Sequence, residues 1–267
     1  MRLKPKKSLG QNFLTDKNVQ NKIIGACALH KEDVVLEIGA GKGDMTRRLA
    51  EEAGKVYSLE IDKGLIPVLE ENLKDFPNCV ILNKDILKFD INRFREECSP
   101  QRKIKVVGNI PYYISTPIIE RLIACRGAVD SAFITVQKEF ARRVCAEAGS
   151  KDYGSFSCFV RYYAQTCILF EIKRGSFVPV PGVDSLFLKL VFRAVPSVKV
   201  EQEDKLFKLI RGAFGQRRKI LRNSLSGLVD PLVLEDFLAR EGIDRRARAE
   251  ELTLENFAGL GRYAGFC

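Results

Sequence analysis

The sequence offers little material for a metal site. It contains one histidine, His30, and none of its eight cysteines forms a C-x-x-C pair. Because zinc sites are built from histidine and cysteine side chains at short spacings, we expect no metal centre. Several cysteines lie in apolar runs, which is typical of small buried residues. The eight are Cys27, Cys79, Cys98, Cys125, Cys145, Cys158, Cys167 and Cys267.

Long apolar runs are also missing. No stretch is long enough to span a bilayer, and the N-terminus lacks the apolar core of a signal peptide. Cysteines without a disulfide pattern are typical of proteins in reducing compartments. We therefore expect a cytoplasmic protein with no membrane partner.

What the chain has in excess is positive charge. Lysine and arginine total 44 against 34 acidic residues, which gives a net charge of +10. This favours a polyanionic partner, although solvated lysines on an ordinary surface give the same total. With 267 residues, 46% of them hydrophobic, the chain can form one large domain or a large and a small one.

The central feature of the sequence is the tetrapeptide Asn109-Ile110-Pro111-Tyr112. It follows an apolar run at 104–107 that indicates a buried strand, and it precedes a helix start at Ser115, with Pro117 just inside. In open α/β sheets, ligands bind at such strand-to-helix turns.

The tetrapeptide suits the binding of a flat base by its exocyclic amine. The side-chain oxygen of Asn109 and the carbonyl of Ile110 can both accept hydrogen bonds, Pro111 fixes the turn, and Tyr112 offers a stacking face. The alternative interpretation is a rigid strand-end turn with a half-buried tyrosine.

A glycine-rich turn follows an earlier strand. Residues Val34–Ile38 lead directly into Gly39-Ala40-Gly41-Lys42-Gly43, and an amphipathic helix comes next. Glycines at such a turn let a ligand approach the backbone closely. Asp44 stands where the dinucleotide fingerprint has its third glycine, and its charge opposes a pyrophosphate there. The turn therefore favours a nucleoside ligand without a phosphate.

Acidic residues end the next two predicted strands, 55–59 and 79–82. Glu60 lies about twenty residues beyond the glycine turn, where a carboxylate can accept both ribose hydroxyls. Asp85 can accept from an adenine amine while Ile86 packs on the ring. Each acid alone is more typical of a solvated strand end, but three such turns on one sheet edge indicate a binding site.

Taken together, these motifs resemble those of the S-adenosylmethionine-dependent rRNA adenine N6-dimethyltransferases. The matching segments are Gln11-Asn12-Phe13-Leu14, 37–43, Glu60-Ile61-Asp62, Asp85 and 109–112, and the resemblance covers nearly the whole chain. It implies an α/β, Rossmann-like class I methyltransferase fold, with a seven-stranded, mostly parallel sheet and a small C-terminal helical domain.

The resemblance also implies the roles of individual residues. S-adenosylmethionine, with S-adenosylhomocysteine as product, would contact Asn12, Leu14, Gly39, Gly41, Glu60, Ile61, Asp85, Ile86 and Asn109. The target adenine would lie against residues 109–112, and Phe177 would stack on it opposite Tyr112. The alternative for Phe177 is a loop side chain packed into the core. Residues 8–14 either close over the ligand or pack the N-terminus against the core.

A change of composition near residues 193–199 predicts a linker. We expect a catalytic, cofactor-binding domain at 1–195 and a helical RNA-recognition domain at 196–267. Residues 151–157 indicate a polar turn into further strands, and a helix is expected to begin at Gln216. The start of that helix is basic, which suits phosphate contacts but equally a solvated face. The basic residues are Arg217, Arg218, Lys219 and Arg222.

The C-terminal pattern resembles that of the KsgA group, which modifies small-subunit rRNA. The matching segments are 213–219, 222–225, 242–244 and 248–250. The resemblance implies an enzyme that transfers methyl groups to two adjacent adenosines in a 3′-terminal hairpin loop, within a small ribosomal subunit or its precursor, and that takes part in assembly. We expect a monomer, although nothing in the sequence indicates the oligomeric state. Three alternatives stay open: an assembly factor with little turnover, a large-subunit rRNA adenine methyltransferase, and a DNA adenine methyltransferase.

Overall fold

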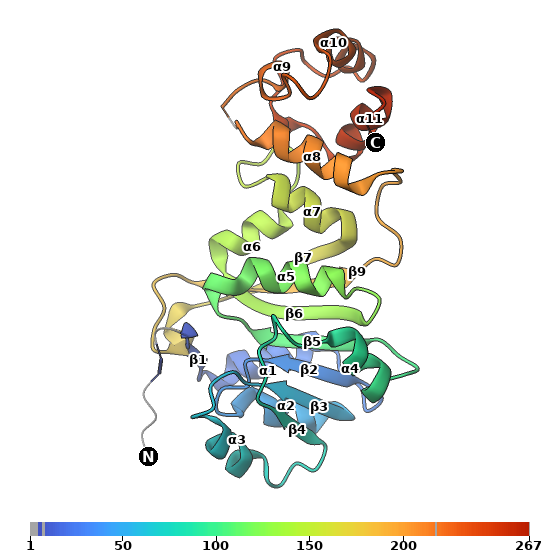
Figure 1. The fold of residues 1–267 in the computed structure, drawn as a ribbon. Helices are drawn as coiled ribbons and strands as arrows, with labels where there is room; N and C mark the ends of the chain where they lie inside the picture. The colour runs from blue at the N-terminus through green and yellow to red at the C-terminus, as the bar shows by residue number, and fades with distance from the viewer. Residues whose placement is uncertain (1–4, 7–8, 217, 267) are drawn as a thin grey trace. The chain divides into compact units, whose positions relative to one another are not determined.

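The computed structural model describes residues 5–6, 9–216 and 218–266. These residues form two compact units. The first comprises the described residues up to Ala141 together with Cys167–Ala194, and the second comprises Arg142–Thr166 and the described residues from Val195 onward. Figure 1 shows the strands and helices of both units along the chain.

The first unit is built on a seven-stranded sheet with the strand order β4-β3-β2-β5-β6-β9-β7. Neighbours from β4 to β6 pair in parallel, and β6 pairs with β9 antiparallel. This mostly parallel sheet confirms the predicted α/β fold class. The strands are β2 Val34–Ile38, β3 Lys55–Leu59, β4 Cys79–Leu82, β5 Ile104–Asn109, β6 Val129–Gln137, β7 Ala164–Ile172 and β9 Ser185–Phe192.

Helices connect the parallel strands, as crossover connections require. Before the first of these strands, a helix begins at Lys17, where the Asp16 carboxylate caps it by accepting from the backbone N–H groups of Asn18 and Val19. The helices in this part of the chain are α1 Lys17–Cys27, α2 Asp44–Glu52, α3 Ile66–Leu73, α4 Ile91–Cys98, the 3-10 helix η2 Tyr112–Ile114, α5 Ser115–Ala124 and α6 Lys138–Cys145.

Alternation along the strands divides the core between the two faces of the sheet. Val35 of β2 and Val107 of β5 pack with Ile23 of α1 and Leu49 of α2, so these two helices cover one face. Leu36 of β2 points to the opposite face and is also fully buried. Burial on both faces explains why these strands appear in the sequence as continuous apolar runs.

The direction of the strand order reverses at β2, whose two neighbours are β3 and β5. The chain winds outward from β2 to β3 and β4 on one side, and continues through β5 and β6 on the other. A crevice forms at the carboxyl ends of the strands at such a reversal. The glycine turn after β2 and the tetrapeptide after β5 therefore lie side by side.

A short second sheet holds the N-terminal segment in place. Strand β1, Phe13–Leu14, pairs antiparallel with β8, Phe177–Val178, so that Leu14 lies opposite Phe177. The backbone N–H of Thr15 also donates to the Ser176 carbonyl at 2.9 Å. The segment that contains Asn12 is thereby tied to the loop that precedes β9.

The second unit is helical and has an aromatic core. Phe159 of α7 meets Phe207 of α8 with ring centroids 5.4 Å apart, and Phe214 of α8 meets Phe257 of α11 at 5.8 Å. Its elements are α7 Ser155–Tyr163, α8 Glu203–Phe214, α9 Leu221–Ser224, α10 Pro231–Arg240, the 3-10 helix η4 Ala249–Glu251 and α11 Leu254–Tyr263.

Residues 142–166 group with this second unit, whereas the sequence-based division placed them in the first domain. The physical reason is the contact between α7 and α8, which buries the aromatic side chains of α7 against a helix more than forty residues later in the chain. The division near residue 195 coincides with the other edge of the unit.

Two local expectations differ from the structure. Residues 151–157 were expected to lead into strands, but they lead into α7, whose first turn is capped when the Gly154 N–H donates to the Ser157 hydroxyl. Packing of the aromatic face decides the outcome over β-propensity. The helix expected from Gln216 begins only at Leu221, where α9 starts.

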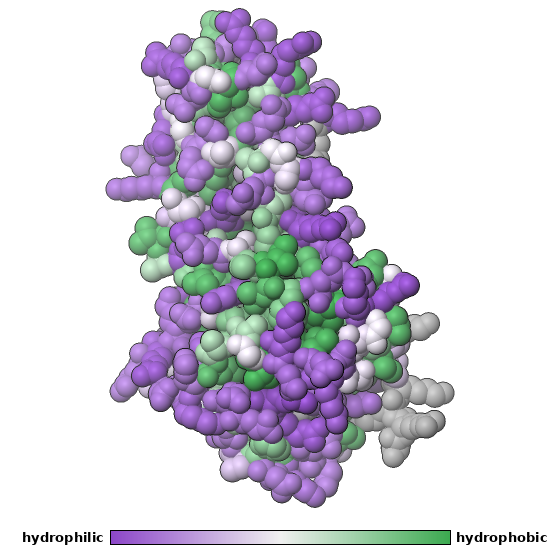
Figure 2. All heavy atoms as spheres, turned by 180° about the vertical axis from the view of Figure 1, so that it is seen from behind, coloured by the Kyte–Doolittle hydropathy of each residue, from purple (hydrophilic) through white to green (hydrophobic). Residues whose placement is uncertain are grey.

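Hydrophilic side chains cover most of the face that Figure 2 shows, and hydrophobic side chains interrupt them in patches. Within the described residues, no helix is both long and apolar enough to cross a bilayer. The same residues hold no group of three or more histidine, cysteine or acidic side chains that could bind a metal ion.

Candidate active site

One cavity lies at the carboxyl ends of β4, β3, β2 and β5. Its walls are the turns that follow these four strands and the N-terminal segment Leu9–Phe13. It is lined by Leu9, Gly10, Gln11, Asn12, Phe13, Ile38, Gly39, Gly41, Leu59, Glu60, Ile61, Lys84, Asp85, Ile86, Asn109, Ile110, Pro111, Tyr112, Tyr113 and Ile114.

This cavity brings together most of the residues singled out in the sequence. The tetrapeptide 109–112 lines it, and so does every predicted cofactor residue except Leu14. Leu14 lines an adjacent cavity with Glu37 and Met45, and the two cavities share Phe13, Gly39, Gly41 and Asn109. Residues 8–14 were expected either to close over a ligand or to pack the N-terminus against the core. In the structure, Leu9–Phe13 line the first cavity and Leu14 lines the adjacent one.

The glycine turn is folded by its own backbone. Gly39 and Gly41 have φ angles of +80° and +59°, which side chains rarely tolerate. The N–H groups of Gly39 and Ala40 donate to the Leu59 carbonyl, which fixes the turn against β3. A Cβ atom at Gly41 would approach the Phe13 ring to 3.1 Å, so glycine also leaves room for the N-terminal segment.

Glu60 is a buried carboxylate that ties two walls of the cavity together. Its Oε2 accepts from the Gly41 N–H at 2.8 Å, and its Oε1 accepts from the Asp62 N–H at 2.8 Å. Burial raises its pKa, and the backbone N–H groups of Asp62 and Gly41 oppose that shift. Each carboxylate oxygen can accept a further hydrogen bond, so Glu60 retains acceptors for a ligand.

The Asp62 carboxylate anchors the N-terminal segment through hydrogen bonds. Only 5% exposed, it accepts from the Lys6 ammonium at 2.6 Å, from Gln11 Nε2 at 3.0 Å and from the Gly64 N–H at 2.9 Å. The pKa of Asp62 is lowered, because these hydrogen bonds together outweigh the desolvation that opposes them. The carboxylate therefore stays charged and keeps Gln11 at the wall of the cavity.

Glu37 lies on β2 beneath the adjacent cavity and is 2% exposed. Its Oε2 accepts from the Thr46 hydroxyl at 2.6 Å and from the Ser58 hydroxyl at 2.7 Å. Burial raises the pKa of Glu37 to about 7, although both hydroxyls act in the opposite direction. This side chain links β2, α2 and β3 directly behind the glycine turn.

The orientation of the Asn109 amide is fixed by a backbone acceptor. Asn109 Nδ2 donates to the Asn12 carbonyl at 2.7 Å. Because the amide is planar, Oδ1 points away from Asn12 and stays available as an acceptor. This is the orientation that the binding of an exocyclic amine requires.

The other residues of the tetrapeptide are held equally firmly. Ile110 is buried, and Pro111 has φ −58° and ψ 133°, which turns the chain into η2. The Tyr112 hydroxyl shares a hydrogen bond of 2.8 Å with the Ser185 hydroxyl of β9. Burial raises the pKa of Tyr112, so its phenol remains neutral.

Phe177 is not where the sequence-based expectation placed it. Its side chain is 1% exposed, and it is not among the described residues that line the two cavities. Its ring belongs to the core cluster that contains Leu14, Ile23 and Phe187. The reason is the pairing of β8 with β1, which places Phe177 over this core, as the alternative interpretation had it.

The basic cluster belongs to the second unit. Arg218 and Lys219 are exposed in the turn before α9, whereas Arg217 lies outside the described residues. Arg222 is exposed but forms an ion pair of 3.0 Å with Glu235. Arg218 and Lys219 are therefore better placed than Arg222 to contact a phosphate.

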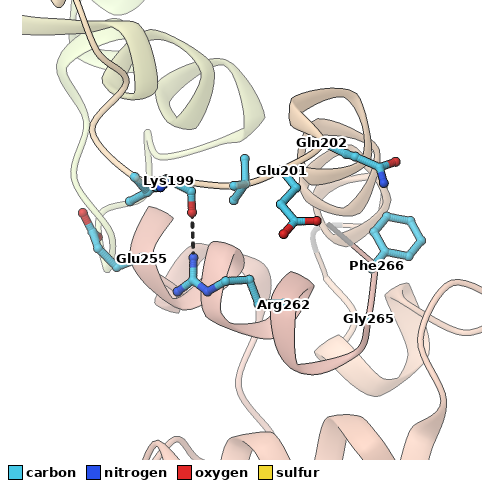
Figure 3. A pocket seen from close by; sticks show the side chains of 9 residues that line it. Lys199, Glu201, Gln202, Glu255, Arg262, Gly265 and Phe266 are labelled. Carbon is cyan, nitrogen blue, oxygen red and sulfur yellow. Dashed lines mark hydrogen bonds between the residues drawn. The ribbon is translucent and has the colours of Figure 1, made fainter.

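The second unit has a cavity of its own, shown in Figure 3. Arg262 of α11 donates to the Lys199 carbonyl at 3.0 Å across this cavity. Glu201 and Glu255 also line it, so its charge favours neither a phosphate nor a cation. It contains none of the residues singled out in the sequence.

Some residues of the site were not predicted. Ser185 supports Tyr112 from a strand more than seventy residues later, and nothing in the sequence indicates that contact. Asp62 lies within a matching motif and Gly10 lies beside one. Only the structure shows that Asp62 holds Gln11 and that Gly10 forms a turn with a positive φ angle. Tyr113 directly follows the tetrapeptide and was not singled out.

Comparisons with known proteins fit this geometry. A family model described as ribosomal RNA adenine dimethylase matches residues 2–264. Ribosomal RNA small subunit methyltransferase A of Caldanaerobacter subterraneus subsp. tengcongensis is 44% identical over 259 residues, which cover 97% of this chain and 96% of the relative.

Two solved structures share the fold over 95% of this chain. A dimethyladenosine transferase from Plasmodium falciparum superposes with a TM-score of 0.78 at 26% identity, and 98% of that chain is covered. The 23S rRNA methyltransferase ErmE has a TM-score of 0.77 at 26% identity, with 100% of that chain covered.

The raised pKa of Glu37 predicts a pH dependence of stability. Below the pKa of an unfolded glutamate, about 4.3, both states hold the proton. Between there and the folded pKa of about 7, only the unfolded chain releases it, so stability falls as the pH rises and then levels off. Glu37→Gln should remove this fall, which amounts to roughly 4 kcal/mol.

Urea unfolding across this pH range checks the prediction. The exposed Glu71, changed to Gln, serves as the control and should leave the wild-type profile unchanged. Parallel profiles for Glu37→Gln and the wild type would contradict the assignment.

The clamp at Asp62 predicts that Asp62→Ala releases the N-terminal wall of the cavity. The N–H groups of Leu9 and Gln11 donate to the Lys6 carbonyl, and Lys6 loses its partner in this variant. We expect their amide hydrogen exchange to accelerate by about 10- to 150-fold, since hydrogen bonds to charged groups contribute about 1.5–3 kcal/mol. Hydrogen exchange with mass spectrometry measures this.

Glu71→Ala is the matched control, because it breaks an exposed ion pair with Lys74 elsewhere in the first unit. Unchanged exchange at residues 9–13 in Asp62→Ala would show that the clamp does not hold this segment.

Proposed function

The chain belongs to the ribosomal RNA adenine dimethylase family, and we propose that it methylates the N6 amine of two adjacent adenosines in small-subunit rRNA. The adenosines lie in a 3′-terminal hairpin loop, and the product is N6,N6-dimethyladenosine. The observation that carries this proposal is the fixed amide of Asn109, whose Oδ1 faces away from Asn12 in the cavity that also holds Glu60.

The residues that line the cavity suit the chemistry of S-adenosylmethionine. The glycine turn lets the ligand approach the backbone, and the buried Glu60 keeps acceptors for two ribose hydroxyls. Asp85 and Ile86 lie at the end of β4, where they can accept from the adenine amine and pack on its ring. Asn12, Leu14 and Ile61 complete the proposed contacts. When bound, this cofactor supplies an electrophilic methyl group on a sulfonium, and it leaves as S-adenosylhomocysteine.

The acceptor turn fits the adenine that receives the methyl group. The N6 lone pair of adenine is delocalised into the ring and is a weak nucleophile. Asn109 Oδ1 and the Ile110 carbonyl can accept from the N6 hydrogens and favour a pyramidal nitrogen, which stabilises the transition state. The Tyr112 ring, fixed by Ser185, holds the base in line for attack. The nitrogen then loses a proton, which needs no dedicated base in the protein.

Phe177 supports this site from the core. Its ring packs in the same cluster as Leu14, and its strand β8 pairs with β1, which directly follows Asn12 in the chain. A stacking contact of Phe177 with the base requires this ring to leave the core. We therefore assign the stacking face to Tyr112.

We further propose that the second unit contributes RNA recognition through Arg218, Lys219 and, more weakly, Arg222. On this proposal the first unit binds the cofactor and carries out the transfer. The protein acts in the cytoplasm as a monomer on a small ribosomal subunit or its precursor, and takes part in its assembly.

The alternatives have less support. A large-subunit methyltransferase is represented by ErmE at 26% identity, against 44% for the relative named for the small subunit. An assembly factor with little turnover does not need the fixed acceptor turn. A DNA adenine methyltransferase would share the base-binding turn, and duplex DNA in the assay below tests it.

The proposal predicts that Asn109→Ala abolishes methyl transfer while the protein stays folded and still binds RNA. The wild type, incubated with labelled S-adenosylmethionine and unmethylated small-subunit particles, should yield dimethyladenosine, identified by the mass of the nucleoside. Removing one acceptor of a transition-state hydrogen bond typically costs about 100- to 1,000-fold in rate. Tyr112→Ala should behave similarly.

Tyr112→Phe is the matched control, because it keeps the stacking face and loses only the hydrogen bond to Ser185. It should retain most of the activity. Unchanged turnover in Asn109→Ala would refute the assigned pocket.

The basic cluster predicts a second effect, on RNA binding alone. Changing Arg218 and Lys219 to alanine should weaken binding and flatten its dependence on salt, by about 0.9 in slope for each lost phosphate contact on duplex-like sites. Binding titrations at several salt concentrations measure this. The double change of Arg93 and Lys74 removes the same charge from exposed positions in the first unit and should have little effect. Equal effects of the two pairs would assign binding to net charge rather than to the cluster.

A further inference from the structure

Tyr113 is a large aromatic side chain that the proposed chemistry does not use. It is 62% exposed, yet it lines the same cavity as Asn109 and Tyr112. It belongs to η2, the single turn of 3-10 helix that follows Pro111. An aromatic side chain left open to water at the rim of a binding cavity indicates a contact with something that enters the cavity.

The two consecutive tyrosines point in different directions. A 3-10 helix has three residues per turn, so neighbouring side chains are about 120° apart. Tyr112 reaches inward to Ser185, and Tyr113 therefore stays at the rim. Part of its ring packs against Gly10, where a Cβ atom would come within 3.2 Å of it. The ring is thus supported on one side by the N-terminal segment, while most of it remains accessible.

We propose that Tyr113 stacks on the nucleotide adjacent to the target adenine in the RNA. This inference rests on the proposed function. An adenine can reach Asn109 only after it leaves its stack, and its neighbour then loses a stacking partner. The exposed face of that neighbour is presented at the rim of the cavity, where Tyr113 offers a replacement.

The size of the effect follows from known base stacking on aromatic side chains. One such stack strengthens binding by about 5- to 150-fold. Stacking tolerates any base, since every base has a flat face, so Tyr113 is expected to select a single-stranded, splayed neighbour rather than a sequence. It would thereby favour loops over paired RNA.

A different role for Tyr113 makes different predictions. If the ring serves only as an apolar support for Gly10 and the cofactor wall, a leucine should replace it, and cofactor binding should suffer when it is removed. If it stacks on a base, phenylalanine should replace it and leucine should not. The affinity for S-adenosylhomocysteine should then be unchanged in every variant.

The experiment uses the full chain and small-subunit particles whose rRNA carries 2-aminopurine, introduced with a ligated synthetic 3′ segment. The fluorescent base stands at the nucleotide adjacent to the target adenosine, which keeps its N6 amine. Its fluorescence falls when it stacks on an aromatic ring. The variants are Tyr113→Ala, Tyr113→Leu and Tyr113→Phe, with Ile168→Ala as a control at another exposed apolar position, on β7.

We expect Tyr113→Ala and Tyr113→Leu to weaken particle binding by about 5- to 150-fold and to abolish quenching at the adjacent nucleotide. Tyr113→Phe and Ile168→Ala should match the wild type.

Retained quenching at the adjacent nucleotide in Tyr113→Ala would overturn the inference alone, as would wild-type behaviour of Tyr113→Leu or a parallel loss of S-adenosylhomocysteine affinity. A wild type that transfers no methyl group to adenosine in these particles would overturn the proposed function, and this inference with it.

Discussion

The hydrogen bond from Asn109 Nδ2 to the Asn12 carbonyl is the contact on which the site depends. It spans ninety-seven residues of sequence and fixes which end of the amide faces the cavity. Asn12 is in turn held by the pairing of β1 with β8 and by the clamp of Lys6 and Gln11 on Asp62. The N-terminal segment therefore determines that Asn109 presents its oxygen, and not its nitrogen, to the cavity. The same segment also forms a wall of the cavity.

Buried carboxylates stabilise the other walls in two different ways. Glu60 and Asp62 follow the same strand, yet burial raises the pKa of the first, while hydrogen bonds from Lys6 and Gln11 lower the pKa of the second. Glu60 lines the cavity, and each of its oxygens can accept a further hydrogen bond, whereas Asp62 already accepts from Lys6, Gln11 and Gly64. One short segment thus provides both the proposed binding group and a structural clamp.

Much of this arrangement could be predicted from the sequence, because the signals are local. The parallel strands 34–38, 55–59 and 79–82, the glycine turn and the tetrapeptide all follow from apolar runs and the residues that end them. What the sequence did not show depends on distant contacts. The aromatic residues of α7 pack against α8, and Phe177 is buried in the core where β8 pairs with β1. The Tyr112 hydroxyl shares a hydrogen bond with Ser185. None of these partners can be identified from spacing along the chain.

The most direct test of the account is a structure of the complex with S-adenosylhomocysteine and an RNA that carries the target adenosine. The account predicts the adenine N6 within about 2.7–3.2 Å of Asn109 Oδ1, with Nδ2 still donating to the Asn12 carbonyl and the base lying on Tyr112. An amide turned so that Nδ2 faces the base, or an adenine bound outside this cavity, would contradict it.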